Sequence, residues 1–484
     1  MDQEELKKRG KALAQKAVRT AKKTGRYVEH YGVTEVARKA AEYGLTHEDY
    51  DSIRLSEIAS EEELAHEREN PIADGPRISI LVPVYEPSET GFRQMLESVK
   101  AQTYENWELC LADASEEPLK KLSELIGAEK YDRVRYMKLS ENGGISANTN
   151  KALMAASGEY VAFLDQDDIL EPNALYELVS ALTPETDLAY TDEDKVSHDL
   201  EHYERPFRKP DYNETLLFTT NYICHFLLLR RSLVEKLGGL RQDYDGAQDY
   251  DLILRAVDLI RKEHGAVAPR IAHVAKVLYH WRMDDSSASG DAFAKEYAFK
   301  AGRAALEDAV KRRPEYENLD VRVHALKNPG YYRLKIGRGD YPMDEIMDYV
   351  FLKSENMEIT GGSIQDLIER ALLTGADVVI PRQLKAGRYL YQGIARAGKG
   401  HTVSLKGKPA WYHGPYQMAM VDMEVDVAPC DGILIRKEYV PALKAQLAAR
   451  KDPAAEGRSS RINRKQEWSK DLKMVYAPEV ELTE

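Results

Sequence analysis

The segment from Tyr160 to Asp168 constrains the fold more than any other part of the chain. Its first half is apolar and has the length of a buried strand, and its end brings Asp165, Asp167 and Asp168 within four residues. In open α/β sheets, ligands bind beyond the carboxyl ends of the strands. Carboxylates this close repel one another unless a cation or a hydrogen-bond donor lies among them. Oxygen ligands of this kind suit Mg²⁺ or Mn²⁺ together with a substrate phosphate. The segment therefore predicts a metal–diphosphate site, with a solvated acidic turn as the alternative.

Strand-like and helix-like segments alternate around this site. Apolar runs predict strands at 78–84, 107–112, 134–139, 160–164, 224–229 and 274–281, and amphipathic segments predict helices at 91–101, 146–157, 249–262 and 293–312. Alternation of this kind predicts an α/β fold with a mostly parallel, Rossmann-like sheet and right-handed crossovers.

The 484 residues have room for two to four domains. We expect a helical, basic N-terminal segment and linker over 1–74, an α/β domain over 75–315, a degenerate second module over 316–443 and a basic tail over 444–484. The first boundary rests on the turn-forming stretch 70–76, which is rich in Pro, Gly and Asp.

Composition excludes several classes of protein. With 31% charged and 43% hydrophobic residues, the chain is typical of a soluble globular protein, and no stretch reaches the length of a membrane span. No signal peptide is visible, and three distant cysteines fit neither a disulfide framework nor a cysteine metal site, so we expect a cytoplasmic location. The net charge of −13 argues against general nucleic-acid binding.

The two ends of the chain are basic, in contrast to its acidic body. Residues 1–45 hold 11 Lys/Arg against 6 Asp/Glu, and residues 436–473 hold 11 against 5. These ends could contact anionic lipid at the inner face of a membrane, or they could be solvated helical segments.

Further chemistry-bearing residues stand where strands end or helices begin. Tyr85 follows the first strand, Asp113 the second, the pair Gly143-Gly144 opens a helix, Asp249 opens another, and His280 lies near the end of a later strand. Taken singly, these residues have ordinary explanations as an edge-strand end, helix N-caps, a turn and a core histidine. Their combination and order favour one common site.

With these residues in place, the sequence resembles the inverting family 2 glycosyltransferases of the GT-A fold over about residues 76–290. It is most similar to the bacterial members that build cell-surface polysaccharides, some of which carry tandem modules. The stretches that carry this closer resemblance are 189–195, 209–211, 221–225, 248–252 and 279–282.

The resemblance implies how a nucleotide-diphosphate sugar would be bound. Pro83, Val84 and Tyr85 would line the base through their backbone, and Asp113 would accept a hydrogen bond from a base N–H. Asp165 would hold the ribose or support the metal from outside its ligand shell.

The resemblance also implies the groups around the reacting atoms. Asp167 would ligate the metal, Mn²⁺ or Mg²⁺, and His280 would reach the metal or the diphosphate. Asp249 would be the general base that deprotonates the acceptor hydroxyl, which belongs to a glycan or a lipid-linked glycan. Gln248, Trp281 and Arg282 would lie near the acceptor or the diphosphate. The sequence leaves open the donor sugar, the linkage, and assembly with a second copy or a partner transferase.

Two departures from the family pattern bear on these roles. Gln248 stands where the family often has Glu before the base, which removes a charge that could tune it. Thr149 stands where the wider family often has Arg, so we assign it no diphosphate role.

Similarity between two parts of the chain predicts a degenerate repeat. Residues 349–356 match 160–168 if Ala162 is skipped, 377–380 match 187–190, and 430–437 match 224–231, in the same order. In that alignment Lys353, Glu355 and Asn356 replace the three Asp residues. We expect a non-catalytic remnant of a second transferase module, with coincidence between apolar strands as the alternative.

Two other functions compete with a glycosyltransferase. A sugar nucleotidyltransferase would carry a Gly-rich, Arg-containing loop after the first strand, whereas residues 86–89 read Glu-Pro-Ser-Glu. A non-catalytic scaffold would keep the fold but would have no need for Asp165, Asp167, Asp249 and His280. We therefore prefer the enzyme for the first module and the scaffold for the second.

Overall fold

A computed structural model gives the fold of the chain. It describes residues 50–116, 133–283, 296–337, 347–402, 404–450 and 472–484, together with residues 25, 28–29, 32–34, 36–38 and 41. Most of the predicted basic N-terminal segment, and residues 451–471 of the predicted basic tail, lie outside the described residues. The membrane contact predicted for these ends therefore stays a prediction.

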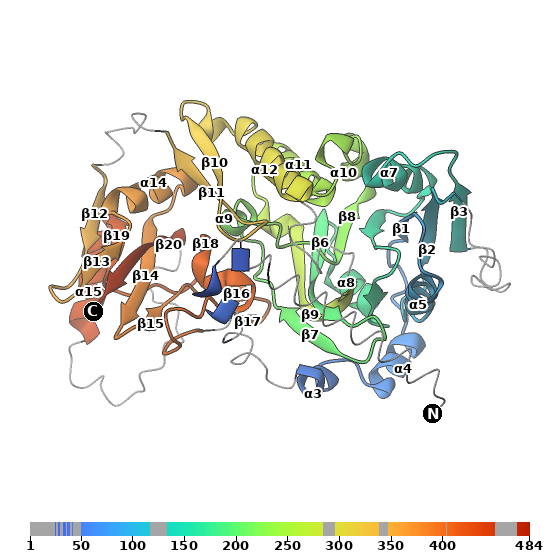
Figure 1. The fold of residues 1–484 in the computed structure, drawn as a ribbon, viewed down its shortest axis with the longest axis horizontal. Coiled ribbons are helices and arrows are strands. Elements are labelled where there is room, and N and C mark those ends of the chain that lie inside the picture. The colour runs from blue at the N-terminus through green and yellow to red at the C-terminus, as the bar shows by residue number, and fades with distance from the viewer. Residues whose placement is uncertain are drawn as a thin grey trace.

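The first module is a nine-stranded mixed sheet with helices packed against it (Figure 1). Its strands are β1 (Ile78–Val84), β2 (Trp107–Asp113), β3 (Val134–Lys138), β4 (Tyr160–Phe163), β5 (Ile169–Leu170), β6 (Leu188–Val196), β7 (Tyr203–Phe207), β8 (Leu227–Arg230) and β9 (Ile271–Arg282). The order is β3-β2-β1-β4-β8-β6-β9-β5, with β7 paired to β6. Strands β8, β5 and β7 run against the others, so the predicted mostly parallel α/β sheet is confirmed.

After β1, the described part of this module has six helices of at least six residues. They are α5 (Glu89–Lys100), α7 (Ile145–Ala155), α8 (Ala174–Ala181), α10 (Arg231–Lys236), α11 (Gln248–His264) and α12 (Glu296–Lys311). The hydroxyl of Ser88 accepts the Gly91 N–H at the start of α5. Gly144, with φ of 89°, turns the chain into α7, a conformation that glycine adopts without steric cost.

Two short helices, α3 (Tyr50–Leu55) and α4 (Glu61–Glu69), precede the sheet and pack against its β5–β7–β9 side. Ser60 and Glu63 form a reciprocal capping box at the start of α4. The Tyr50 hydroxyl donates to Asp194 of β6 at 2.9 Å, and the Arg54 guanidinium donates to Glu171. This N-terminal part therefore belongs structurally to the first module.

The second module repeats half of the first sheet, strand for strand. Its strands are β12 (Tyr349–Leu352), β13 (Glu358–Gly361), β14 (Val378–Lys385), β15 (Arg388–Tyr391), β19 (Ile433–Arg436) and β20 (Met474–Thr483), with the helix α14 (Ile364–Thr374) after β13. The order β12-β19-β14-β20-β13 has the same parallel and antiparallel pairings as β4-β8-β6-β9-β5, and β15 pairs with β14 as β7 pairs with β6.

Side-chain contacts repeat together with the strands. The Arg230 guanidinium lies 4.8 Å from the Tyr160 ring centroid and donates to Asp187 at 3.2 Å. In the second module, the Arg436 guanidinium lies 4.8 Å from the Tyr349 ring centroid and is paired with Asp377 at 3.3 Å. Agreement in topology, register and side-chain contacts supports the predicted repeat over coincidence between apolar strands.

The register corrects the predicted alignment of the two acidic regions. Phe163 pairs with Leu227 in the first sheet, and Leu352 pairs with Ile433 at the equivalent place in the second. No residue is therefore skipped, and skipping Ala162 was wrong because a slip of one residue would turn every side chain to the other face. Ser354, Glu355, Asn356 and Met357 thus stand at the places of residues 165, 166, 167 and 168.

The second module lacks the half of the sheet that precedes β4. Among the described residues, its sheet has no counterpart of β1, β2 or β3. Strand β20 lies between β14 and β13, so residues 474–483 form part of this module rather than of a separate tail. The boundary predicted at residue 444 is corrected accordingly.

The two modules share one hydrophobic core. Tyr222 and Leu229 from the first module belong to the same buried cluster as Val421 and Ile433 from the second. Figure 1 shows the second module, coloured orange to red, lying beside the β6–β8–β9 side of the first. No helix of the described residues has both the length and the apolar character needed to cross a membrane.

Candidate active site

The acidic end of β4 is held in place by the end of β9. The Asp168 carboxylate is buried and accepts hydrogen bonds from the Tyr279 hydroxyl and, at 2.7 Å, from the Arg282 N–H. Burial, with the charges of Asp165 and Asp167, raises the pKa of Asp168 well above its ordinary value. Three crowded carboxylates are therefore costly to ionise together, as the sequence predicted, and a cation among them would lower that cost.

The Arg282 side chain donates hydrogen bonds to the backbone of this turn and of a neighbouring segment. Its Nε donates to the Asp167 carbonyl oxygen and one of its terminal nitrogens donates to the His198 carbonyl oxygen, each at 2.6 Å. The side chain is 2% exposed. In this arrangement Arg282 fixes the backbone of the acidic turn. Its predicted place near the acceptor or diphosphate stays a prediction.

His280 occupies a different environment from the one predicted. Its Nδ1 lies 2.6 Å from Asp194, and its Nε2 lies 2.9 Å from Glu171. Burial alone would lower the pKa of His280, but the Asp194 and Glu171 carboxylates outweigh it and raise the pKa to about 9. Because both ring nitrogens are engaged, this geometry offers no lone pair to a metal and argues against the predicted ligand role. His280 instead joins β9 to the carboxylates that contact α3.

The ends of β1 and β2 lie side by side, as expected for a nucleotide site. Val84 pairs with Asp113, and the backbone N–H of Tyr85 donates to the Gln166 side chain at 2.8 Å. Asp113 is buried and accepts from the Ser115 N–H at 2.9 Å and from the Tyr136 hydroxyl at 2.7 Å. Val84 is buried and Pro83 half-buried, whereas Tyr85 is exposed, so Tyr85 is accessible to a ligand at this edge.

Asp249, the predicted base, is held by the loop that precedes β8. It is the second residue of α11, and its carboxylate accepts from the Asn221 side-chain amide at 2.9 Å. Burial, followed by the charge of Asp249, raises the pKa of the Cys224 thiol well above its ordinary value. Gln248 accepts from the Gly246 N–H at 2.8 Å and so closes the turn before the helix.

Sequence reasoning assigned no role to Asn221, Lys195 or His225, although all three lie in motifs that carry the family resemblance. Within β6 and β9, Glu193 pairs with Tyr279 and Lys195 pairs with Trp281. The His225 ring stacks on Tyr279 with centroids 5.0 Å apart and meets Trp281 at 6.0 Å.

These contacts connect the two halves of the site. His225 lies in the same loop as Asn221, which donates to Asp249, and its ring stacks on Tyr279, which donates to Asp168. Glu193 accepts the His225 N–H, and the buried Lys209 ammonium donates to Glu193 at 3.4 Å and to the Ile223 carbonyl at 3.0 Å. Only the fold reveals this loop as a support for Asp249, because its hydrogen bonds join segments far apart in the chain.

No complete metal centre is preformed among the described residues, since no three His, Cys, Asp or Glu side chains there converge on one point. A Mg²⁺ or Mn²⁺ ion bound by one or two carboxylates plus substrate phosphates needs no such preformed cage. The carboxylates of Asp165 and Asp167 supply oxygen ligands of this kind. The residues present therefore fit a metal that arrives with a diphosphate.

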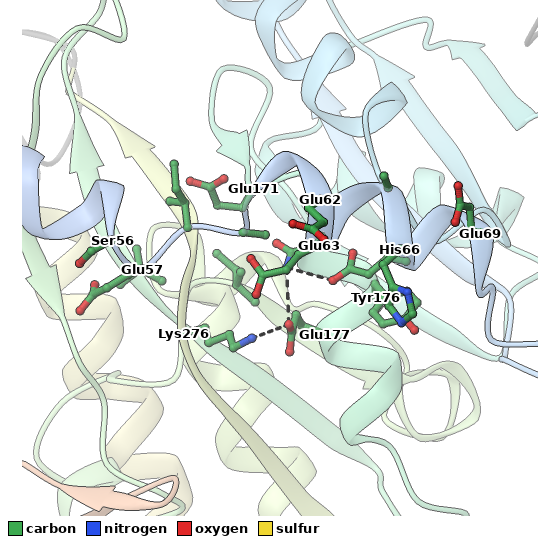
Figure 2. Close-up of a pocket in the computed structure, with 17 residues that line it drawn as sticks. Ser56, Glu57, Glu62, Glu63, His66, Glu69, Glu171, Tyr176, Glu177 and Lys276 are labelled. Carbon is green, nitrogen blue, oxygen red and sulfur yellow. Dashed lines mark hydrogen bonds and ion pairs between the residues drawn. The ribbon is translucent and has the colours of Figure 1, made fainter.

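A cavity of about 820 Å³ lies elsewhere, between α4 and the α8–β9 side of the sheet (Figure 2). Glutamates dominate its lining, and Lys276 points toward Glu177 within it. None of the predicted site residues lines this cavity. It touches the candidate site only through Glu171, the partner of His280.

Comparisons with known proteins show what the first module is similar to. Residues 79–238 match the family model described as glycosyl transferase family 2. The uncharacterized protein y4gI of Sinorhizobium fredii is 41% identical over 246 residues, which are 50% of this chain and 26% of that protein. The O-antigen biosynthesis protein RfbC of Myxococcus xanthus is 36% identical over 245 residues, 50% of this chain and 18% of that protein. The chain thus spans about a quarter or less of the length of these relatives.

A solved structure matches part of the chain at low identity. S. aureus TarS 1–349, in complex with UDP-GlcNAc, is 18% identical, with 50% of this chain and 72% of that chain covered and a TM-score of 0.38.

Proposed function

We propose that this chain, whose residues 79–238 match the glycosyl transferase family 2 model, is an inverting enzyme of cell-surface polysaccharide synthesis. It transfers a sugar from a nucleoside-diphosphate sugar to a hydroxyl group of a glycan or a lipid-linked glycan. The donor class is the one implied by the resemblance to family 2 glycosyltransferases, whose family model residues 79–238 match. The acceptor class is supported by the O-antigen biosynthesis protein RfbC.

The convergence of three strand ends carries this proposal. The neighbouring parallel strands β2, β1 and β4 end beside one another, at Asp113, Tyr85 and Asp165. Ligands of α/β sheets bind at such carboxyl ends. The base would lie by Asp113 and Tyr85, and the diphosphate would lie by Asp165 and Asp167.

Asp249 would act on the acceptor. Its carboxylate takes the proton of the acceptor hydroxyl while that oxygen attacks the anomeric carbon. The bond from the anomeric carbon to the diphosphate oxygen breaks, its electron pair leaves with the nucleoside diphosphate, and the new glycosidic bond has inverted configuration. A positioned carboxylate base contributes roughly 10²–10⁴-fold to such a step.

A divalent metal would be held by Asp167, with Asp165 beside it. Bound there, Mn²⁺ or Mg²⁺ would polarise the diphosphate and offset its charge. Burial and then the charges of Asp165 and Asp167 raise the pKa of Asp168, and this crowding of carboxylates supports a cation at this place.

A donor screen tests the proposal. The purified chain is incubated with a panel of nucleoside-diphosphate sugars in the presence of Mn²⁺, Mg²⁺ or EDTA, and thermal unfolding and release of nucleoside diphosphate are measured. We expect one donor class to raise the melting temperature in a metal-dependent manner and to be slowly hydrolysed. If no donor has an effect with either metal, the proposal fails.

A further inference from the structure

Lys195 is a partly buried cation that has no carboxylate partner among the described residues. It lies on β6 beside the end of β9, and its Nζ is 4.3 Å from the centroid of the Trp281 ring. Among the described residues, no carboxylate oxygen lies within 4.0 Å of this ammonium group. Its nearest acidic neighbours have other partners. Glu193 accepts from His225 and Lys209, and Glu204 pairs with Arg205 at 3.1 Å.

This environment is unfavourable for an ammonium ion in the free protein. Burial and then the Arg205 charge lower the pKa of Lys195 to about 8, although Glu193, Glu204 and Asp168 oppose them. A desolvated charge without a direct partner destabilises a protein. An anion placed against Lys195 would remove that cost, so the site is better suited to the ligand-bound state than to the free one.

The position of Lys195 indicates which anion this is. Side chains alternate between the two faces of a strand, so Tyr279 and Trp281 lie on the opposite face of β9 from His280. Lys195 pairs with Trp281 across β6 and β9, and the N–H of the next residue, Arg282, donates to Asp168 at 2.7 Å. The ammonium group therefore stands beside the acidic turn, where the donor diphosphate would lie.

We propose that Lys195 binds the diphosphate of the sugar donor and stabilises the negative charge that grows on it as the anomeric carbon–oxygen bond breaks. This role rests on the proposed function. The electron pair of the broken bond stays on the diphosphate oxygen, while the acceptor proton goes to Asp249. The lysine gives up no proton in this step. The contact with the Trp281 ring and the pairing of β6 with β9 position the ammonium group before the donor binds.

The test compares Lys195→Met with Lys195→Arg, and uses Lys311→Met as a control because Lys311 is exposed at the end of α12. Calorimetry measures binding of the nucleoside diphosphate and of the nucleoside of the donor that the screen identifies. We expect Lys195→Met to weaken nucleoside-diphosphate binding by about 10- to 100-fold, the range for a hydrogen bond to a charged group. Nucleoside binding should not change, and Lys195→Arg should recover much of the lost affinity.

A second readout separates this role from a structural one. Because Lys195→Met removes an ammonium group that has no carboxylate partner, its ligand-free melting temperature should equal or exceed that of the wild type. Equal loss of nucleoside and nucleoside-diphosphate affinity with a lower melting temperature would overturn the proposal. So would unchanged diphosphate binding by Lys195→Met in a chain whose wild type is active, and this outcome would leave the proposed function intact. A wild type that binds no nucleoside diphosphate would overturn both.

Discussion

Replacing His280 by Asn should destabilise the protein by an amount that depends on pH. The imidazole is 1% exposed and lies between the carboxylates of Asp194 and Glu171. In the unfolded chain it titrates near 6.5, whereas in the folded protein its pKa is about 9. A raised pKa means that the stabilisation is fully present below pH 6.5 and is lost as pH rises through 9. The difference between the two values corresponds to roughly 3 kcal/mol.

The measurement is the unfolding of wild type and His280→Asn between pH 6 and 10, by heat or by urea. The free energy of unfolding of the wild type should exceed that of the variant by roughly 3 kcal/mol near pH 6.5. This difference should fall by about 1.4 kcal/mol per pH unit toward pH 9. His66→Asn is a matched control, since His66 is exposed on α4, and its profile should follow the wild type.

Two results would refute this reasoning. If the free energies of unfolding of the wild type and of His280→Asn differ by the same amount at every pH in this range, the histidine is not held as an imidazolium. If the variant keeps its stability but loses metal-dependent transfer, the metal-binding role implied by the family resemblance is the better description.

Three further predictions address the two modules. Asp249→Asn should keep donor affinity and lower kcat by at least ~10²-fold, measured by calorimetry and steady-state kinetics; an equal loss of affinity would indicate a structural role. Asp167→Ala should abolish the metal-dependent thermal shift with donor, and a shift that persists would misplace the metal site. Asp422→Ala removes the buried carboxylate that Arg333 and Arg370 share at 3.1 Å and leaves them only the more distant Glu479, so urea unfolding should show a loss of about 1.5–3 kcal/mol, the range for hydrogen bonds to charged groups. Donor affinity that falls with it would contradict a non-catalytic second module.

The sequence predicted six of the nine strands of the first sheet, because these are apolar runs, but it did not predict β5, β6 or β7. The runs at 78–84 and 107–112 became β1 and β2 with nearly unchanged bounds. The internal repeat was also visible, but its gap was misplaced. Skipping Ala162 improved the match between residue types, whereas strand pairing shows which residues share a face, and only the fold provides it.

The site was harder to predict than the fold, because its side chains depend on partners from distant segments. His280 and Trp281 are neighbours in sequence but lie on opposite faces of β9, and nothing in the local sequence says which face meets the ligand. The carboxylates that hold His280 come from β6 and from the segment after β5. Likewise, the bond from Asn221 to Asp249 joins residues 28 positions apart.

The second module has counterparts of the strands that lie around Asp249 in the first module. It lacks counterparts of the strands that would bind a nucleotide. Its segment 415–420 packs against β7, where the Tyr416 and Phe207 rings stack with centroids 3.9 Å apart. The Lys209 ammonium lies 5.9 Å from the same Phe207 ring centroid and holds the loop that carries Asn221. A chain of direct contacts therefore runs from the second module to the support of Asp249. The two modules also share one buried core, so loss of the second module would expose apolar surface. It would disturb the position of Asp249 before it affected the ends of β1 and β2. This asymmetry explains how a module without an acidic turn of its own can be retained beside a catalytic one.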